Sequence, residues 1–171
     1  VFEDLSVFGE SHSIENEKSI LNSRNIMRKV IMNLDLRHEY YSLGTVTGFN
    51  RFEQYKNAPI QVEFKYNDTI KFINTRHKLK LKVESESKIR INTEQGGYTY
   101  KFNKWYPVKN KNIQIRIIRS EFFTKQAIDR EYEYHMIPLE ACVNKYLSKL
   151  SILQKAKNSA ILKLTIRHQS K

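Results

Sequence analysis

The sequence of 171 residues is poor in the residues that interrupt or crosslink a chain, with 5 Gly, 3 Pro and 1 Cys. So little Gly and Pro leaves no flexible linker, and the sequence shows no internal repeat or low-complexity tract. The single cysteine, Cys142, excludes a disulfide within the chain. There is no run of 18 apolar residues, which a membrane-spanning helix needs. The chain starts at Val1, without Met or a signal-peptide pattern, and we interpret it as a piece of a longer chain.

Motifs of common catalytic and cofactor sites are also missing. The sequence contains neither GxGxxG nor GxxxxGK[ST], so nothing supports a phosphate-binding loop. No two histidines have the spacing of metal ligands. The histidines are His12, His38, His77, His135 and His168.

The remaining candidates for chemistry have simpler interpretations. Cys142 is expected to be a buried structural residue on the apolar face of a helix, because no activating histidine is near it in sequence. Asp129, Glu131 and Glu133 occupy alternate strand positions, which is typical of a solvated face. His77 is interpreted as part of a basic surface turn. We therefore expect a segment without catalytic residues, cofactor or metal.

Hydrophobic periodicity predicts two helices. The first spans about residues 14–35, with Ser13 as its N-cap and acidic residues in its first turn. Its apolar stripe is expected to be core and consists of Ile20, Ile26, Met27, Val30, Ile31 and Leu34. The second spans about 138–149 and starts at Pro138, which suits the first turn of a helix.

Period-two alternation predicts strands over 60–66, 79–83, 88–92, 98–102, 112–118, 130–137 and 160–166. Gly96 and Gly97 indicate a hairpin, and Leu162, Leu164 and Ile166 are expected on an inner face. Each strand has one polar, solvent-exposed face, which favours a mixed, largely antiparallel sheet. We predict an α+β fold with both helices packed on the sheet. The whole chain, 1–171, forms one domain with a strand-rich basic insert at about 60–120.

The composition is strongly basic, with 30 Lys and Arg against 18 Asp and Glu, a formal charge of +12. Residues 61–119 hold 14 of the basic and 5 of the acidic residues, a local excess of +9. Such an excess favours polyanionic partners such as nucleic acid, anionic lipid or acidic polysaccharide. The candidate contact residues are Lys78, Lys80, Lys82, Lys88, Arg90 and Arg116.

Aromatic residues near these strands leave two interpretations open. Basic strands with exposed rings are used by proteins that bind single-stranded nucleic acid. Tyr98, Tyr100 and Phe102 share one parity, however, which places Lys101 on the opposite face. The simpler interpretation makes the rings core and the lysines solubilising or protective of a sheet edge.

Three blocks of the sequence resemble a known family. "IENEKSILNSRNIMRKVIMNLDLRHEYY" is similar to the start of the periplasmic domain in Wzz-type chain-length determinants, also called polysaccharide co-polymerases. The matching positions are Asn16, Glu17, Leu21, Ser23, Arg24, Val30, Leu34 and Leu36. "IPLEACVNKYLSKLSI" and "NSAILKLTI" resemble a later helix and strand of the family. They match at Pro138, Leu139, Glu140, Tyr146, Leu150, Ile152, Ser159, Ile161 and Leu164.

The third block, "FNRFEQYKNAPIQVEF", resembles an element of the tyrosine autokinases of capsule and exopolysaccharide synthesis. It matches at Tyr55, Pro59, Ile60 and Val62. The family's long coiled-coil helices and its Pro-rich segment have no counterpart in this sequence, and the basic insert matches no family motif.

The resemblance implies a non-catalytic periplasmic segment of a bacterial inner-membrane protein that forms homo-oligomers. Such a protein controls capsular or exopolysaccharide chain length or export, together with the polymerase or export machinery. In the autokinase branch a separate cytoplasmic kinase domain follows. Arg24 is expected to make a structural hydrogen bond or ion pair. The alternatives are a cytosolic domain that binds single-stranded nucleic acid and, third, a peripheral membrane module.

Overall fold

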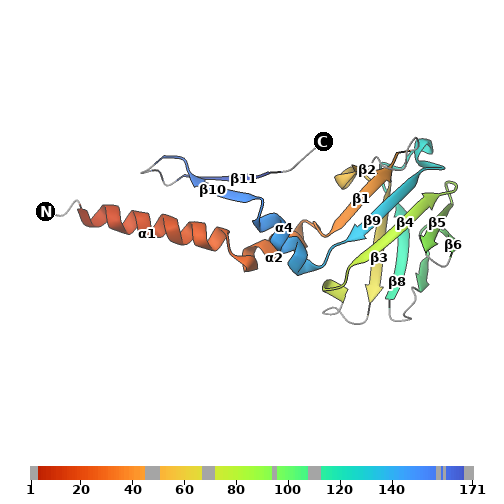
Figure 1. Ribbon diagram of the computed structural model, residues 1–171, viewed down its shortest axis with the longest axis horizontal. Coiled ribbons are helices and arrows are strands. Elements are labelled where there is room, and N and C mark those ends of the chain that lie inside the picture. Colours follow the sequence, from red (N-terminus) through yellow and green to blue (C-terminus); the bar gives the residue numbers. More distant parts are fainter. Residues whose placement is uncertain are drawn as a thin grey trace. The chain divides into compact units, whose positions relative to one another are not determined.

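The computed structural model describes residues 4–44, 51–66, 72–93, 96–107, 113–156, 159 and 161–167. The chain divides into two compact units. The terminal unit combines both ends of the chain, Val1–Leu36 and Leu139–Lys171, and the central unit is Arg37–Pro138. Helices and largely antiparallel strands are both present, so the predicted α+β class is confirmed (Figure 1).

The terminal unit contains helices α1 (Asp4–Leu21), α2 (Arg24–Asn33) and α4 (Leu139–Leu147) and strands β10 (Leu150–Gln154) and β11 (Leu162–Ile166). The helix predicted over 14–35 is thus two helices, and the prediction of Ser13 as an N-cap is wrong because Ser13 lies within α1. The cap is Ser23. Its backbone is extended (φ −74°, ψ 143°), and its Oγ accepts a hydrogen bond from Ile26 N at 3.3 Å. A serine so placed starts a new helix.

The central unit is built from two antiparallel sheets. The large sheet has the order β2-β1-β9-β4-β5-β6, and the small sheet has the order β3-β8-β7. The strands of the large sheet are β1 (His38–Leu43), β2 (Arg51–Glu53), β4 (His77–Val83), β5 (Lys88–Thr93), β6 (Gly96–Lys101) and β9 (Glu131–Met136). Those of the small sheet are β3 (Ile60–Tyr66), β7 (Trp105–Pro107) and β8 (Ile113–Arg119), and two 3-10 turns, η1 (Tyr55–Asn57) and η2 (Lys125–Ala127), connect strands.

All seven predicted strands are present, while β1, β2, β7 and β10 were not predicted. The predicted hairpin is confirmed as the β5–β6 pair, with Thr93 opposite Gly96. Gly96 and Gly97 begin β6 instead of forming the turn. Residues 94–95, which connect the two strands, lie outside the described part of the chain.

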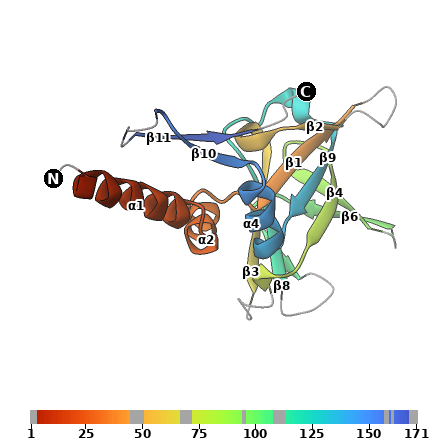
Figure 2. The same ribbon diagram turned by 60° about the vertical axis from the view of Figure 1, so that its left-hand side comes forward.

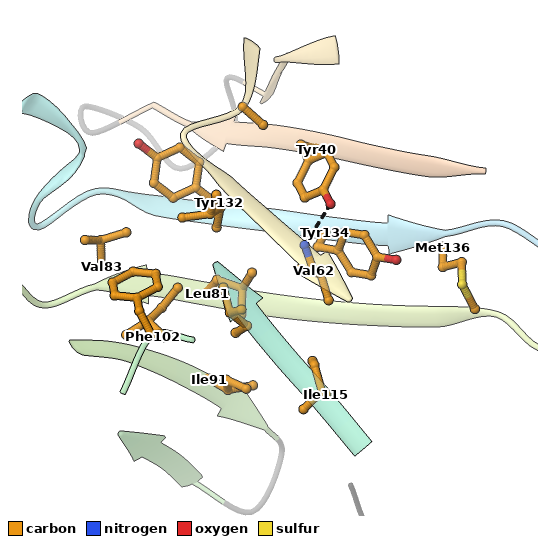
Figure 3. Packing of buried hydrophobic residues seen from close by; sticks show 14 of the residues in the cluster. Tyr40, Val62, Leu81, Val83, Ile91, Phe102, Ile115, Tyr132, Tyr134 and Met136 are labelled. Carbon is orange, nitrogen blue, oxygen red and sulfur yellow. Dashed lines mark hydrogen bonds between the residues drawn. The ribbon is translucent and has the colours of Figure 1, made fainter. Parts of the chain in front are cut away.

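The apolar faces of the two sheets meet to form the core of the central unit (Figure 3). Leu81, Val83 and Ile89 of the large sheet and Ile60 of the small sheet are fully buried there. Thus a second sheet covers the apolar face of the large sheet, where we expected helices. Period two shows that a strand has an apolar face, but it does not specify what covers that face.

One hydrogen bond joins the two sheets directly. The Tyr40 hydroxyl on β1 accepts a bond from the backbone N–H of Val62 on β3 at 2.9 Å (Figure 3). β3 is an edge of the small sheet, so this N–H has no strand partner on that side. Both residues are buried, and the hydroxyl therefore satisfies a donor that water cannot reach.

Candidate polyanion interface and helix-pair site

The outer face of the large sheet holds most of the predicted polyanion contacts. Side chains alternate between the two faces along a strand. Leu81 and Val83 are buried, so Lys78, Lys80 and Lys82 point to the outer face. Arg90 lies directly beside Lys82 in the β4–β5 register. Lys88 has the same parity as Arg90 on β5. The structure thus brings five of the six predicted residues onto one face.

Arg116 does not belong to this face. It lies on β8 of the small sheet, between Glu63 and Trp105 on the neighbouring strands. Its guanidinium forms an ion pair with Glu63 at 2.5 Å and lies 4.7 Å from the centre of the Trp105 ring. The inward positions of β8 are Ile115 and Ile117. Arg116 therefore points out on the opposite side of the sandwich, away from the other five predicted residues.

The aromatic residues of β6 have the predicted parity. Tyr100 lies opposite the fully buried Ile89. Phe102, just beyond the strand, is buried, and Tyr98 is 54% exposed. Lys101 has the opposite parity and lies beside Lys88. On β6, rings and cations thus occupy opposite faces, whereas a base-stacking platform needs them on the same one.

Part of the charge on the outer face is already neutralised. Arg90 Nε donates to Glu84 Oε1 at 2.5 Å, and the Thr99 hydroxyl donates to Glu84 Oε2 at 3.0 Å. The bond from Arg90 holds the pKa of Glu84 below its usual value. Lys78 Nζ lies 3.6 Å from Glu133 Oε1.

Glu133 is the centre of a buried ionic cluster. The prediction that it is solvated is wrong, because only 9% of its side chain is exposed. Arg51 Nε and His135 Nε2 each lie 3.3 Å from Glu133 Oε2, without the geometry of a hydrogen bond. Three potential cations, including Lys78, thus surround one carboxylate, which lets it be buried. Sequence spacing could not show this, because Arg51 comes from the unpredicted strand β2.

Tyr41 and Glu39 extend the cluster along β1. The Arg51 guanidinium lies 3.9 Å from the centre of the Tyr41 ring, and the Tyr41 hydroxyl donates to Glu39 Oε2 at 2.7 Å. Burial and this bond raise the pKa of Tyr41 above its usual value. Burial lowers the pKa of His135, and the nearby Arg51 and Lys78 lower it further, while Glu133 opposes them.

In the terminal unit, motif residues from the two ends of the chain meet. Arg24 on α2 donates to Glu140 Oε2 at 2.5 Å and to Asn144 Oδ1 at 2.8 Å, both on α4. Arg28 Nε donates to Glu140 Oε1 at 2.6 Å. The expected structural ion pair of Arg24 is confirmed. These bonds from Arg28 and Arg24 hold the pKa of Glu140 down at about 2.

The apolar stripe of α2 is only partly core. Met27 and Ile31 are buried, but Val30 and Leu34 are 38% and 52% exposed. Ile20, at the end of α1, is 59% exposed. The expectation that the whole stripe is core is therefore wrong. The helix break at Ser23 separates Ile20 from α2, and within α2 only Met27 and Ile31 are buried.

The other motif residues have varied surroundings. Asn16 and Glu17 are exposed on α1. Pro59 is buried, and its carbonyl accepts a bond from Ser120 N at 3.0 Å. Pro138 directly precedes α4, and Tyr146 is half-buried on it.

Strands β10 and β11 form a two-stranded hairpin on their own (Figure 2). Leu164 lies opposite Ile152, and Ile166 lies opposite Leu150, so these four residues share one apolar face. Leu164 and Ile166 are each 52% exposed, which contradicts their predicted inner position. An isolated two-stranded sheet is marginally stable in water, so this hairpin gains from a further partner.

Two smaller predictions have opposite outcomes. Cys142 is fully buried on α4, as predicted, and its Sγ lies 3.5 Å from the carbonyl oxygen of Leu36. The prediction that His77 lies in a surface turn is wrong. It begins β4, and its ring packs against Phe64 and Phe72 with Nε2 buried and unbonded. Burial lowers the pKa of His77.

Over the described ranges, no helix has the length and apolarity required to cross a membrane. The same ranges contain no group of three or more His, Cys, Asp or Glu placed to hold a metal ion.

The sequence matches no protein-family model, and a search of curated proteins finds no match.

Proposed function

We propose that this chain is the non-catalytic periplasmic part of a bacterial inner-membrane protein of the polysaccharide co-polymerase family, in its tyrosine autokinase branch. It regulates the chain length or export of a capsular polysaccharide or exopolysaccharide, and it acts as a homo-oligomer with the polymerase or export machinery. A kinase activity of the parent protein resides in a separate cytoplasmic domain.

The observation that carries this proposal is the bond between Arg24 and Glu140. Arg24 belongs to the first block that resembles the family, and Glu140 belongs to the last block. In the structure, parts of these blocks form α2 and α4, which pack on each other (Figure 2). The Arg24, Arg28 and Glu140 side chains link the two helices. Ser23, another matched residue, caps α2. Three of the matched residues, Ser23, Arg24 and Glu140, thus act at one contact between two helices.

The distribution of exposed apolar side chains supports the oligomer. Of the twelve large apolar side chains that are exposed among the described residues, eight belong to the terminal unit. They are Ile20, Val30, Met32, Leu34, Leu153, Ile161, Leu164 and Ile166. Apolar surface gathered in one part of a protein marks a contact with another chain. A second copy of this chain is the partner that the proposal requires.

The topology of the parent protein tests the proposal. We expect an apolar span of about 20 residues shortly before Val1 and another after Lys171. A reporter that is active only outside the cytoplasm, inserted between β1 and β2, will then be active in cells. Polar flanking sequences, or a reporter that works only in the cytoplasm, contradict the proposal and favour a cytosolic nucleic-acid-binding domain.

A further inference from the structure

The outer face of β4, β5 and β6 forms a regular grid of polar side chains. Across the three strands, Lys80 is followed by Asn92 and Gly97, and the next row is Lys82, Arg90 and Thr99. In the row after that, Lys88 lies directly opposite Lys101. We name Lys80, Lys82, Lys88 and Lys101 the basic track.

The nearby acidic side chains are occupied by other groups. Glu84 is bonded to Arg90 and Thr99. Glu133, which lies opposite Lys80 in the register, is within ion-pair distance of Arg51, Lys78 and His135 instead. The track lysines form no ion pair with any residue that the structure describes. The nearby Glu84 carboxylate partly offsets the charge of Lys88. The charges of Lys80, Lys82 and Lys101 remain available on the same side of the sheet.

Lys88 and Lys101, both positively charged, lie directly opposite each other on neighbouring strands. Like charges directly opposite each other on neighbouring strands destabilise a sheet. Both side chains are exposed. The Glu84 carboxylate, which is bonded to Arg90 and Thr99, offsets the charge of Lys88 only in part. An anionic group bound between the two ammonium groups would turn this repulsion into two attractive contacts.

The track lysines have the regular spacing of a β-sheet. Lys80 and Lys82 are two residues apart on β4, about 6.8 Å along the strand, and neighbouring strands lie about 4.8 Å apart. At the centre of the face, the Arg90 stem lies over Gly97, which has no side chain. A Cβ built on Gly97 would come within 2.9 Å of Arg90 Cδ.

The same face lacks what a nucleic acid requires for stacking. Its positions on β4, β5 and β6 are held by Lys, Arg, Asn, Thr and Gly, while the rings of β6 have the opposite parity. Proteins that bind single-stranded nucleic acid stack its bases on aromatic rings, whereas carboxylated sugars need only cations and hydrogen-bond donors. Charge complementarity without stacking thus favours an acidic polysaccharide.

We propose that the basic track is a binding surface for an acidic polysaccharide whose charges are carboxylates, such as a polymer of uronic acids. The inference rests on the proposed function, in which the parent protein handles a polysaccharide during its synthesis or export. It adds that the polymer is anionic and that it contacts the central unit through the β4–β6 face.

The test is binding of the full 171-residue chain to polygalacturonate, measured by calorimetry at low and at moderate salt. The test variant carries Lys80→Glu, Lys88→Glu and Lys101→Glu. The control carries Lys56→Glu, Lys65→Glu and Lys125→Glu, which makes the same change in net charge. Lys56, Lys65 and Lys125 are exposed in the central unit, on η1, on β3 and on η2. Circular dichroism confirms that both variants fold.

We expect the wild-type chain to bind polygalacturonate with an affinity that falls as salt rises, and not to bind neutral dextran. The track variant should lose about tenfold in affinity, and the control about twofold or less. Absence of binding, or an equal loss in both variants, overturns the inference. Tighter binding to a thymidine oligonucleotide or to phosphatidylglycerol vesicles, with the same dependence on the track, also overturns it. The topology of the parent protein is measured separately, so the inference and the proposed function can fail independently.

Discussion

Arg24 and Glu140 are bonded at 2.5 Å although 116 residues separate them in the chain. Each lies in the first turn of its helix, Arg24 in α2 and Glu140 in α4. Arg28 binds the second oxygen of the same carboxylate, so both oxygens of Glu140 are engaged. The pair links α2 and α4, and it thereby joins segments from the two ends of the chain within the terminal unit.

The stability of the terminal unit should depend on Glu140 in acid. Its pKa is about 2 in the folded chain against 4.5 for the free side chain, because the bonds from Arg28 and Arg24 favour the carboxylate. The stabilisation is therefore complete above about pH 4.5 and is lost as the pH falls toward 2. Glu140→Gln should remove this part of the pH dependence, as measured by hydrogen exchange of α2 amides at pH 5 and pH 3. Glu131→Gln, at an exposed position, is the control, and equal pH slopes for wild type and Glu140→Gln would contradict the prediction.

The bond between the two sheets should contribute measurably to the stability of the central unit. Tyr40→Phe removes only the hydroxyl and leaves the N–H of Val62 buried without a partner. We expect a loss of about 1–3 kcal/mol in the free energy of unfolding by urea. Tyr98→Phe, at an exposed position of β6, should cost less than about 0.5 kcal/mol. A Tyr40→Phe variant as stable as the wild type would show that this N–H finds another partner.

Much of this fold could be predicted from the sequence, because strands with one apolar face alternate strictly, as in β3, β4, β5, β8 and β9. The strands that were missed are short or lack alternation, such as β2 with three exposed residues. Serine is a common N-cap residue, but Ser23 lies within an apolar stripe that continues across the helix break. The sequence pattern therefore did not indicate the break. The burial of Glu133 depends on Arg51, which is 82 positions away and which only the sheet register brings close.

Glu133 should control the titration of His135. Burial, Arg51 and Lys78 lower the pKa of His135, and the Glu133 charge partly offsets them. Glu133→Gln should therefore lower this pKa further, as measured by NMR titration of the imidazole, while Glu131→Gln leaves it nearly unchanged. Because the folded pKa is below the unfolded value of 6.5, stability from neutral His135 is complete above pH 6.5 and is lost as the pH falls below it. An unchanged or raised pKa in Glu133→Gln would contradict the geometry of the cluster.

The hairpin should mediate self-association. Replacing Leu164 and Ile166 with Ser removes the exposed apolar side chains of β11. We expect the wild-type chain to sediment as an oligomer and this variant to shift toward the monomer, with at least a tenfold weaker association. The control replaces Phe52 and Phe122, which are 56% and 43% exposed in the central unit, with Ser. A wild-type chain that is monomeric at every concentration, or an equal effect of the two variants, would argue against this interface.

The length distribution of the surface polysaccharide tests the central proposal most directly. The parent protein is expressed in its own cells with Arg24→Glu, which places two acidic groups side by side at the α2–α4 contact, and the polymer is resolved by gel electrophoresis. Lys29→Glu, at an exposed position of the same helix, is the matched control. The proposal predicts that Arg24→Glu shifts the distribution toward that of cells lacking the protein, while Lys29→Glu keeps the wild-type distribution. A distribution that is unchanged both by Arg24→Glu and by loss of the whole protein would contradict it.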